Sequence, residues 1–161
     1  MRRLIIILMV VAAMAPSLSL AFQNEPDGFR DLPWGADFAS LEGMTAVEAR
    51  NGDGRTVYAT RAGDTLRHMG TEVESILYRF YGGKLSAVTI AFTGKERYKA
   101  IAARLLSAHG RATRTSHSIT WTGETTRISL RQGPLTFRNS LLTYYHTPYY
   151  RRIVDAYLAD E

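Results

Sequence analysis

The chain has 161 residues, which is enough for one domain with a sizeable hydrophobic core in addition to a short targeting segment. It contains no cysteine, and this excludes disulfide bonds, thiolate catalysis and the attachment of a lipid to a cysteine. The 20 lysines and arginines against 15 acidic residues give a net charge of +5, an excess too small to indicate a nucleic-acid partner.

The first 21 residues are typical of an export signal. Two arginines are followed by an apolar run over residues 4–15 and by a small-residue cleavage site that ends at Ala21. Cleavage there would leave Phe22 at the N-terminus and place the protein in the periplasm or outside a bacterial cell, which fits the lack of cysteine. The alternative is a retained membrane anchor, because the apolar stretch approaches the roughly 20 residues of a spanning helix.

Residues 22–28 are predicted to be a flexible lead, and residues 29–161 a single domain. The lead is followed by FRDLPWG, an aromatic and glycine segment with two interpretations: the lip of an active site, or a plug that closes the fold. Asp37 is placed to cap a helix of one or two turns, which needs burial to be stable. Burial of Trp34 would supply that stability, so the pattern favours the plug.

Two β-hairpins are predicted in the first half of the domain. TAVEAR and TVYATR, at residues 45–50 and 56–61, flank the turn sequence NGDG. In residues 71–92, the Gly82-Gly83 pair separates two runs that alternate between apolar and polar residues, so both strands should line the core. Apolar residues then recur at helical spacing over residues 95–109, and the glycine that follows is expected to end that helix.

Three strand-like runs follow at residues 118–123, 125–131 and 135–145, and an apolar stripe behind Pro148 predicts a closing helix. The complete order is a short helix, four strands, a helix, three strands and a helix. Such an order predicts an α+β fold in which antiparallel β-meander sheets carry the helices on one face. It also suggests a duplicated unit of helix and meander, although no residue-level repeat supports a duplication.

The FRDLPWG opening, the YRFYGGKLSAVTIAF hairpin, the YKAIAARLLSAHG helix and the ITW…ISL…LTYY ending resemble a loose group of small exported bacterial proteins of unknown function, which share an FR-x-x-x-WG opening. More distantly, the order of elements resembles the outer-membrane assembly lipoproteins and the β-lactamase inhibitor proteins. Members of these two groups bind other proteins. The resemblance therefore implies a periplasmic α+β domain that binds a partner, and it carries over no catalytic residue.

The sequence contains no recognisable set of catalytic, cofactor-binding or metal-binding residues. The four histidines are scattered, and no pair has the spacing of a zinc motif. Residues 94–95 lack the rest of a phosphate-binding loop, and no serine lies in a Gly-x-Ser-x-Gly elbow. NGDG lacks the alternating acids of a calcium loop. We therefore expect no catalytic residue, no cofactor and no metal.

Arginines on one face of a predicted strand are the first candidate binding residues. In TTRISLRQ, Arg127 and Arg131 alternate with apolar residues, so both side chains should project from the face opposite the core. Arg114 and Arg138 on neighbouring strands are candidates to join them. Several guanidinium groups on one face can bind phosphate or carboxylate groups bidentately. The alternative is a solvated face that deters aggregation.

A tyrosine cluster near the C-terminus is the second candidate. The last predicted strand and helix contain Tyr144, Tyr145, Tyr149, Tyr150 and Tyr157, beside Arg151 and Arg152. Tyrosine and arginine are the residues that most often anchor protein interfaces. The same residues suit a membrane surface, where arginines meet anionic headgroups. The alternative is that the tyrosines belong to the core and keep their hydroxyl groups at its edge.

These observations favour a non-enzymatic exported binding or adaptor domain that acts through protein–protein contacts. Its expected partner is an envelope protein or an anionic envelope component, with peripheral membrane contact but no nucleic acid. The first alternative is the binding of a small anion or an anionic glycolipid by the arginine face, since residues 95–161 hold 11 basic and only 5 acidic residues. The second alternative is an envelope enzyme with an unrecognised site.

Overall fold

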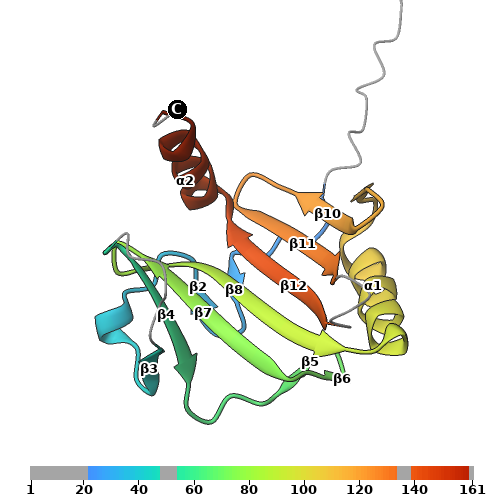
Figure 1. Cartoon of the computed structure of the whole chain (residues 1–161), viewed down its shortest axis with the longest axis horizontal. Coiled ribbons are helices and arrows are strands. Elements are labelled where there is room, and N and C mark those ends of the chain that lie inside the picture. Colours follow the sequence, from blue (N-terminus) through green and yellow to red (C-terminus); the bar gives the residue numbers. More distant parts are fainter. Residues whose placement is uncertain (1–21, 48–53, 134–138, 160–161) are drawn as a thin grey trace, which may run out of the picture.

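The computed structural model describes residues 22–47, 54–133 and 139–159, and an eight-stranded antiparallel sheet dominates this part of the chain (Figure 1). The strands, in spatial order, are β3 (Met44–Val47), β4 (Thr56–Arg61), β7 (Ser75–Tyr81), β8 (Lys84–Thr93), β12 (Asn139–His146), β11 (Thr126–Gln132), β10 (Ser118–Thr122) and β9 (Thr113–Arg114). Two helices complete the fold: α1 (Lys95–His109) and α2 (Thr147–Ala159). The prediction of an α+β meander fold is confirmed.

The sheet consists of two meanders whose last strands meet at its centre. β8 ends the first meander and β12 ends the second, and these strands pair with Thr89 opposite Thr143. Each of them is followed directly by a helix. The two halves of the chain therefore form one continuous sheet. The unit that the topology repeats is a meander followed by a helix, whereas the sequence suggested a helix followed by a meander.

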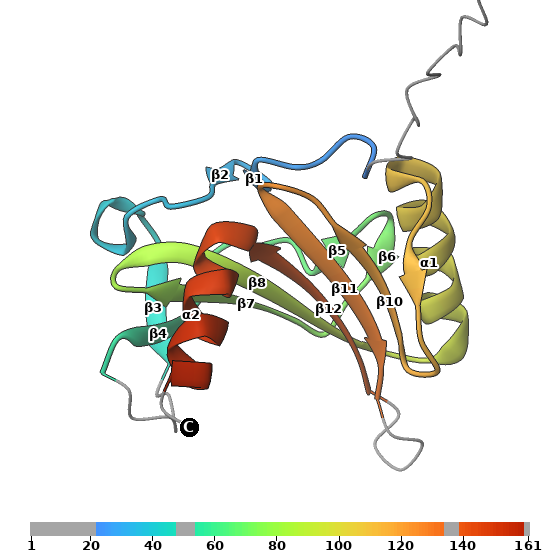
Figure 2. The same cartoon turned by 90° about the horizontal axis from the view of Figure 1, so that it is seen from above.

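One face of the sheet, here called the core face, carries the hydrophobic core. Trp121 of β10, Ile128 of β11 and Tyr144 of β12 occupy one cross-strand row and are buried. α1 lies beside β10 in both views and contributes Ile101 and Leu105 to the same core (Figures 1 and 2). Complete burial of such side chains contributes about 1.5–3 kcal/mol each, so this face accounts for much of the stability of the fold.

Two predicted elements have the bounds that their sequence patterns indicate. α1 extends from Lys95 to His109 and ends where Gly110, at a φ of 73°, donates its N–H to the carbonyl of Leu106. The β7–β8 hairpin turns at Gly82 and Gly83, both of which have positive φ. The apolar positions that alternate along its strands are buried, as expected: Ile76, Tyr78, Phe80, Val88, Ile90 and Phe92.

The FRDLPWG segment packs on the sheet as a plug. It forms a small hairpin of β1 (Gly28–Phe29) and β2 (Leu32–Pro33), and Phe29 and Leu32 are buried in the core. Trp34 is only partly buried, although its indole N–H donates a 2.7 Å hydrogen bond to the hydroxyl of Thr126. The segment therefore contributes Phe29 and Leu32 to the core, whereas Trp34 stays partly exposed.

The helix predicted after Asp37 is reduced to a single 3₁₀ turn, η1 (Phe38–Ser40). Asp37 does not cap this turn with its side chain, because its carboxylate forms an ion pair with Lys84 at 2.5 Å. The segment is too short to form a stable α-helix by itself, so contacts with neighbouring strands fix its position. Another element, the small hairpin of β5 (Arg67–His68) and β6 (Thr71–Glu72), was not predicted.

Residues 22–28, which the sequence predicts to be a flexible lead, are joined by hydrogen bonds to two distant parts of the chain. The N–H of Gln23 donates to the carbonyl of His109 at the end of α1. The carboxylate of Glu25 accepts the backbone N–H groups of Glu124, Thr125 and Thr126, which form the turn between β10 and β11. The segment is a strap across the end of the sheet (Figure 2).

The two helices have different relations to the sheet. The sequence predicts helices on one face. α1 covers the core face, whereas α2 continues from the end of β12, projects beyond it and packs Tyr150 against Tyr145 on the opposite face (Figure 1). Neither of these helices is long and apolar enough to cross a membrane. The predicted export signal at residues 1–21 lies outside the described residues, as do most of the NGDG turn and Arg138.

Candidate functional site

The site lies on the face of β10, β11 and β12 that is opposite the core, here called the outer face. Strand alternation turns Arg127, Ser129 and Arg131 of β11 toward this face, while Ile128 and Leu130 enter the core. The register sets hydroxyl-bearing residues of β10 beside them, because Arg127, Ser129 and Arg131 are paired with Thr122, Thr120 and Ser118. On the other side, β12 sets Tyr145 beside Arg127.

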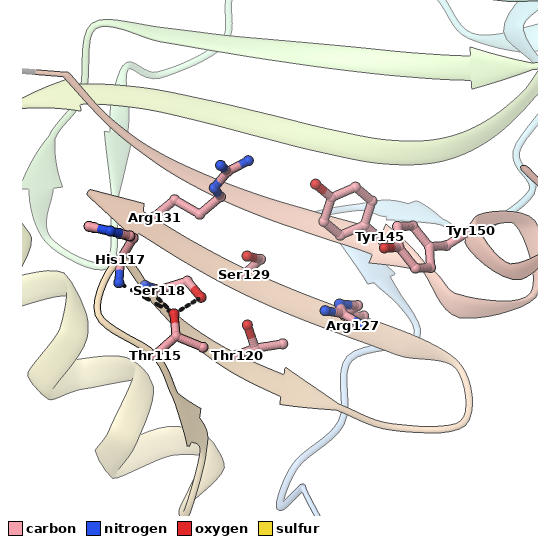
Figure 3. Close-up of a pocket in the computed structure, with 9 residues that line it drawn as sticks. All are labelled: Thr115, His117, Ser118, Thr120, Arg127, Ser129, Arg131, Tyr145 and Tyr150. Atoms are coloured by element: carbon pink, nitrogen blue, oxygen red, sulfur yellow. Dashed lines mark hydrogen bonds between the residues drawn. The ribbon is translucent and has the colours of Figure 1, made fainter. Parts of the chain in front are cut away.

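These side chains surround a hollow of about 340 Å³ (Figure 3). Tyr145 and Tyr150 form one end of the hollow, next to Arg127. Arg131 lies toward the other end, near His117, and Ser129 lies between the two arginines. The complete lining consists of Thr115, His117, Ser118, Thr120, Arg127, Ser129, Arg131, Tyr145 and Tyr150. The hollow is therefore polar, with cationic, hydroxyl and aromatic parts.

Arginines and tyrosines stack at one end of the hollow. The guanidinium carbon of Arg127 lies 5.2 Å from the centre of the Tyr150 ring, and the Tyr145 and Tyr150 rings are 5.1 Å apart. On the far side of Tyr145, the guanidinium carbon of Arg79 lies 5.7 Å from its ring. Because cations are attracted to aromatic faces, this stack positions Arg127 and ties α2 to the sheet.

Arg79 belongs to β7 and reaches the stack over Ala87, which separates it from Tyr145 in the register. Its Nε donates a 3.4 Å hydrogen bond to the hydroxyl of Ser86, and its Nη2 is buried without a hydrogen-bond partner among the described residues. Buried guanidinium nitrogens are normally paired, so this unpaired Nη2 atom is an exception among the described residues.

A turn between β9 and β10 forms the other wall of the hollow. The hydroxyl oxygen of Thr115 accepts the backbone N–H groups of His117, at 3.3 Å, and of Ser118, at 3.1 Å. The Thr115 and Ser118 hydroxyls also lie within hydrogen-bonding distance of each other, at 2.9 Å. This local network orders the wall. The wall is also joined to β11, because the N–H of Gln132 donates a 3.1 Å hydrogen bond to the carbonyl of His117.

The positive charge of the hollow has no counter-charge nearby in the part of the chain that the structure describes. No carboxylate lines the hollow there, and no ion pair of that part includes Arg79, Arg127 or Arg131. Guanidinium groups stay protonated at any physiological pH. The outer face therefore presents fixed positive charge beside hydroxyl donors, an arrangement that attracts anions.

Two of the four predicted arginines meet in the hollow, and two do not. Arg127 and Arg131 lie on the outer face, as the alternation indicated. The prediction that Arg114 joins them is wrong, because Arg114 is paired with Ile119, which faces the core, and side chains of paired residues project to the same side. Arg138 lies outside the described residues.

The predicted tyrosine cluster is divided between different surroundings. Tyr150 contributes to the hollow, whereas Tyr149 packs against His146 with a ring distance of 5.0 Å and carries the guanidinium of Arg152 over its ring. Arg151 and Arg152 are exposed and do not line the hollow. Burial and the charge of Arg152 lower the pKa of His146, which favours its neutral form. The cluster therefore does not form one continuous binding surface.

A second polar cluster lies on the core face beneath the plug. The hydroxyl of Tyr78 donates a 2.7 Å hydrogen bond to Asp64, and Asp64 also pairs with Arg30 at 2.6 Å. The Nε2 atom of His68 lies 2.9 Å from the hydroxyl of Tyr144, and burial lowers the pKa of His68 to about 4. These groups join the plug to the strands, so their evident role is structural.

Several site residues escaped the sequence analysis, including Arg79, His117 and Thr120. Alternation alone places Arg79 on the outer face of β7, but its approach to Tyr145 depends on the pairing of β8 with β12, which are separated by α1 in the sequence. Placing His117 and Thr120 in the site requires the register of β10 against β11. Long-range strand pairing is the information that local patterns lack.

The described residues include no group of histidine, aspartate and glutamate side chains that could hold a metal ion. No protein-family model matches the chain, and no match is found among curated proteins or solved structures. A functional inference therefore has to come from the geometry and chemistry of the outer face.

Proposed function

We propose that the protein is an exported binding domain that holds an anionic component of the cell envelope in the hollow on its outer face. The observation that supports this proposal is the placement of Arg127 and Arg131 on one side of β11, in a hollow that is polar and lacks described carboxylates. Guanidinium groups bind phosphate and carboxylate groups strongly, through paired charge-assisted hydrogen bonds.

Binding of a protein partner through an apolar surface has less support. The large hydrophobic residues that are exposed in the described ranges are Val47, Leu66 and Leu141. They come from β3, from the segment before β5 and from β12, so they do not belong to one element. An apolar docking site normally needs a contiguous patch of a few hundred Å². The resemblance to families that bind proteins stays a prediction.

An enzymatic function also has less support from the hollow. An activated nucleophile needs a hydroxyl group hydrogen-bonded to a base, usually a histidine. Within the described hollow, the hydroxyls of Thr115 and Ser118 are bonded to each other, and the ring of His117 has no hydrogen bond to a hydroxyl. Binding without chemistry is therefore the simpler proposal.

A column that carries phosphate groups tests the proposed function. Arg127→Ser combined with Arg131→Ser should elute at clearly lower salt than the unchanged protein, because exposed charges are screened over about 8–10 Å near physiological ionic strength. The matched control is Arg111→Ser with Arg114→Ser, which removes the same charge from exposed residues outside the hollow. The control should elute close to the unchanged protein. Equal decreases in the eluting salt concentration for both variants would mean that net charge alone determines binding to the column.

Export is tested separately by the mass of the protein in an envelope extract. If the predicted signal is removed after Ala21, the intact mass should correspond to a chain that begins at Phe22. Phe22 packs edge-on against His109 with a ring distance of 5.1 Å, so a chain that starts there keeps the first contact of the strap. A full-length species that sediments with membranes would instead support a retained anchor.

A further inference from the structure

We infer that the anionic component is a carbohydrate that carries an acid group, such as a sugar phosphate or a uronic acid. This inference rests on the proposed function and concerns the same hollow. Its basis is the combination of three features: arginines without carboxylate partners, hydroxyl groups that both donate and accept hydrogen bonds, and tyrosine rings at one end (Figure 3).

The hydroxyl groups argue against a simple inorganic anion. Arginine only donates hydrogen bonds, and phosphate or carboxylate oxygens need only donors, so arginines alone would suffice for such an ion. The hollow adds the hydroxyls of Thr120 and Ser129, which form no hydrogen bond within the described chain. A hydroxyl group has acceptor capacity as well. A ligand with its own hydroxyl groups uses both the donor and the acceptor capacity of these side chains, and an acidic sugar is a common anionic ligand of this kind.

The order of the groups along β11 suggests how such a ligand lies. Arg127 is stacked on Tyr150, whereas Arg131 is exposed and has no ion-pair partner in the described ranges. Four residues of a strand separate their Cα atoms by roughly 13 Å, with Ser129 halfway. We place the acid group near Arg131 and the sugar ring over Ser129, where its C–H groups approach the tyrosine end.

The size of the hollow agrees with a small ligand. About 340 Å³ is near the lower end of the roughly 300–1,000 Å³ found for ligand sites. The floor is low at Ser129 of β11, because this side chain is small and almost completely buried. A folded protein would contact the rim and leave the Ser129 hydroxyl unused, whereas a sugar unit can reach it.

Calorimetric titration of the protein purified from the envelope tests the inference. The probes are glucose 6-phosphate, glucuronate, glucose, inorganic phosphate and a pentaglutamate peptide. At least one of the two acidic sugars should bind about tenfold more tightly than phosphate, because each good hydrogen bond adds a modest increment of affinity. Glucose without an acid group should bind weakly, because it cannot pair with the guanidinium groups.

A hydroxyl-deletion variant separates the inference from the proposed function. Thr120→Val with Ser129→Ala keeps both arginines and nearly the same shape, and circular dichroism checks that the variant folds. It should bind the preferred acidic sugar no better than phosphate, with phosphate binding unchanged. Failure of both acidic sugars to bind the unchanged protein more tightly than phosphate, or tighter binding of pentaglutamate, would overturn the inference and leave the anion site. Failure of every anionic probe would overturn the proposed function itself.

Vesicles distinguish a glycolipid from a free sugar as the source of the acid group. Phosphatidylglycerol vesicles carry phosphate without the sugar ring, whereas lipid A vesicles present a phosphorylated disaccharide. Preferential sedimentation with lipid A, lost in the Thr120→Val and Ser129→Ala variant, would identify a lipid-borne ligand. Equal sedimentation with both vesicles, unchanged in that variant, would mean that the protein recognises membrane charge and not carbohydrate, and this would overturn the inference.

Discussion

The two faces of the eight-stranded sheet differ in how their polar and charged groups are satisfied. On the core face, the indole N–H of Trp121 donates to the carbonyl of Gly110, and the hydroxyl of Tyr78 donates to Asp64. On the outer face, Arg127 and Arg131 have no carboxylate partner in the part of the chain that the structure describes. Structural polar groups are normally paired within the fold, so the unpaired arginines are the observation on which the proposed binding site rests.

The largest effect is expected from the core face. Trp121→Ala removes a side chain that is 1% exposed, and it should lower the free energy of unfolding by about 3–5 kcal/mol. Trp34→Ala should cost less, because Trp34 is only partly buried. The matched control is Thr122→Ala, which changes the next residue of β10 on the outer face. Urea unfolding measures all three, and a Trp121→Ala variant as stable as Thr122→Ala would contradict the assignment of the faces.

A pH-dependent effect of comparable size is expected from His68. Burial lowers its pKa from 6.5 to about 4 in the folded protein, so the unfolded chain takes up the proton first as the pH falls. The contribution of neutral His68 to the free energy of unfolding is complete above about pH 6.5. It is lost as the pH falls from 6.5 to 4, by up to about 3 kcal/mol. His68→Gln should reduce this loss in urea unfolding at pH 7, 5 and 4. Identical pH profiles for the two proteins would refute the role of His68.

An intermediate effect is expected at the strap. Glu25→Ala leaves three N–H groups of the β10–β11 turn without their acceptor, and it should cost about 1–3 kcal/mol. Gly123→Ala should have a similar cost, because a Cβ at this position would collide with the Glu25 carboxylate. If both changes act on one contact, the double variant should be little worse than either alone. Fully additive costs in thermal unfolding would argue against that shared contact.

The smallest effect on stability is expected from the outer face. Arg127→Ser with Arg131→Ser should change the free energy of unfolding by only about 0.5 kcal/mol, because surface substitutions away from core and caps have small effects. Loss of the Arg127 stack on Tyr150 accounts for part of that change. Thermal unfolding of the double variant measures it. A loss of several kcal/mol would show that the arginines are structural and would weaken the proposed binding role.

Local patterns predicted the elements that carry a complete local signal. α1 combines apolar residues at helical spacing with a terminal glycine, and the β7–β8 hairpin combines alternation with a glycine turn, so both were predicted closely. The 3₁₀ turn at Phe38–Ser40 and the strap depend on distant contacts, with Lys84 and with the β10–β11 turn. Local propensity contains no information on such contacts.

The site was predicted in part for the same reason. Alternation within β11 was enough to place Arg127 and Arg131 on one face. The same rule gives no register for the two-residue strand β9, so it could not show that Arg114, a candidate to join them, lies on the opposite face. The stack of Arg79 on Tyr145 joins strands from both meanders, and it becomes visible only once β8 is paired with β12.

The central claim is that the outer face binds anions and the core face does not. The most direct measurement follows the side-chain Nε–H signals of the arginines by NMR during a titration with inorganic phosphate, with assignments from single arginine variants. We predict that the signals of Arg127 and Arg131 shift and saturate together, while that of Arg114 on the opposite face stays in place. Small, unsaturated shifts of all arginines, or a saturating shift of Arg114 alone, would contradict the claim.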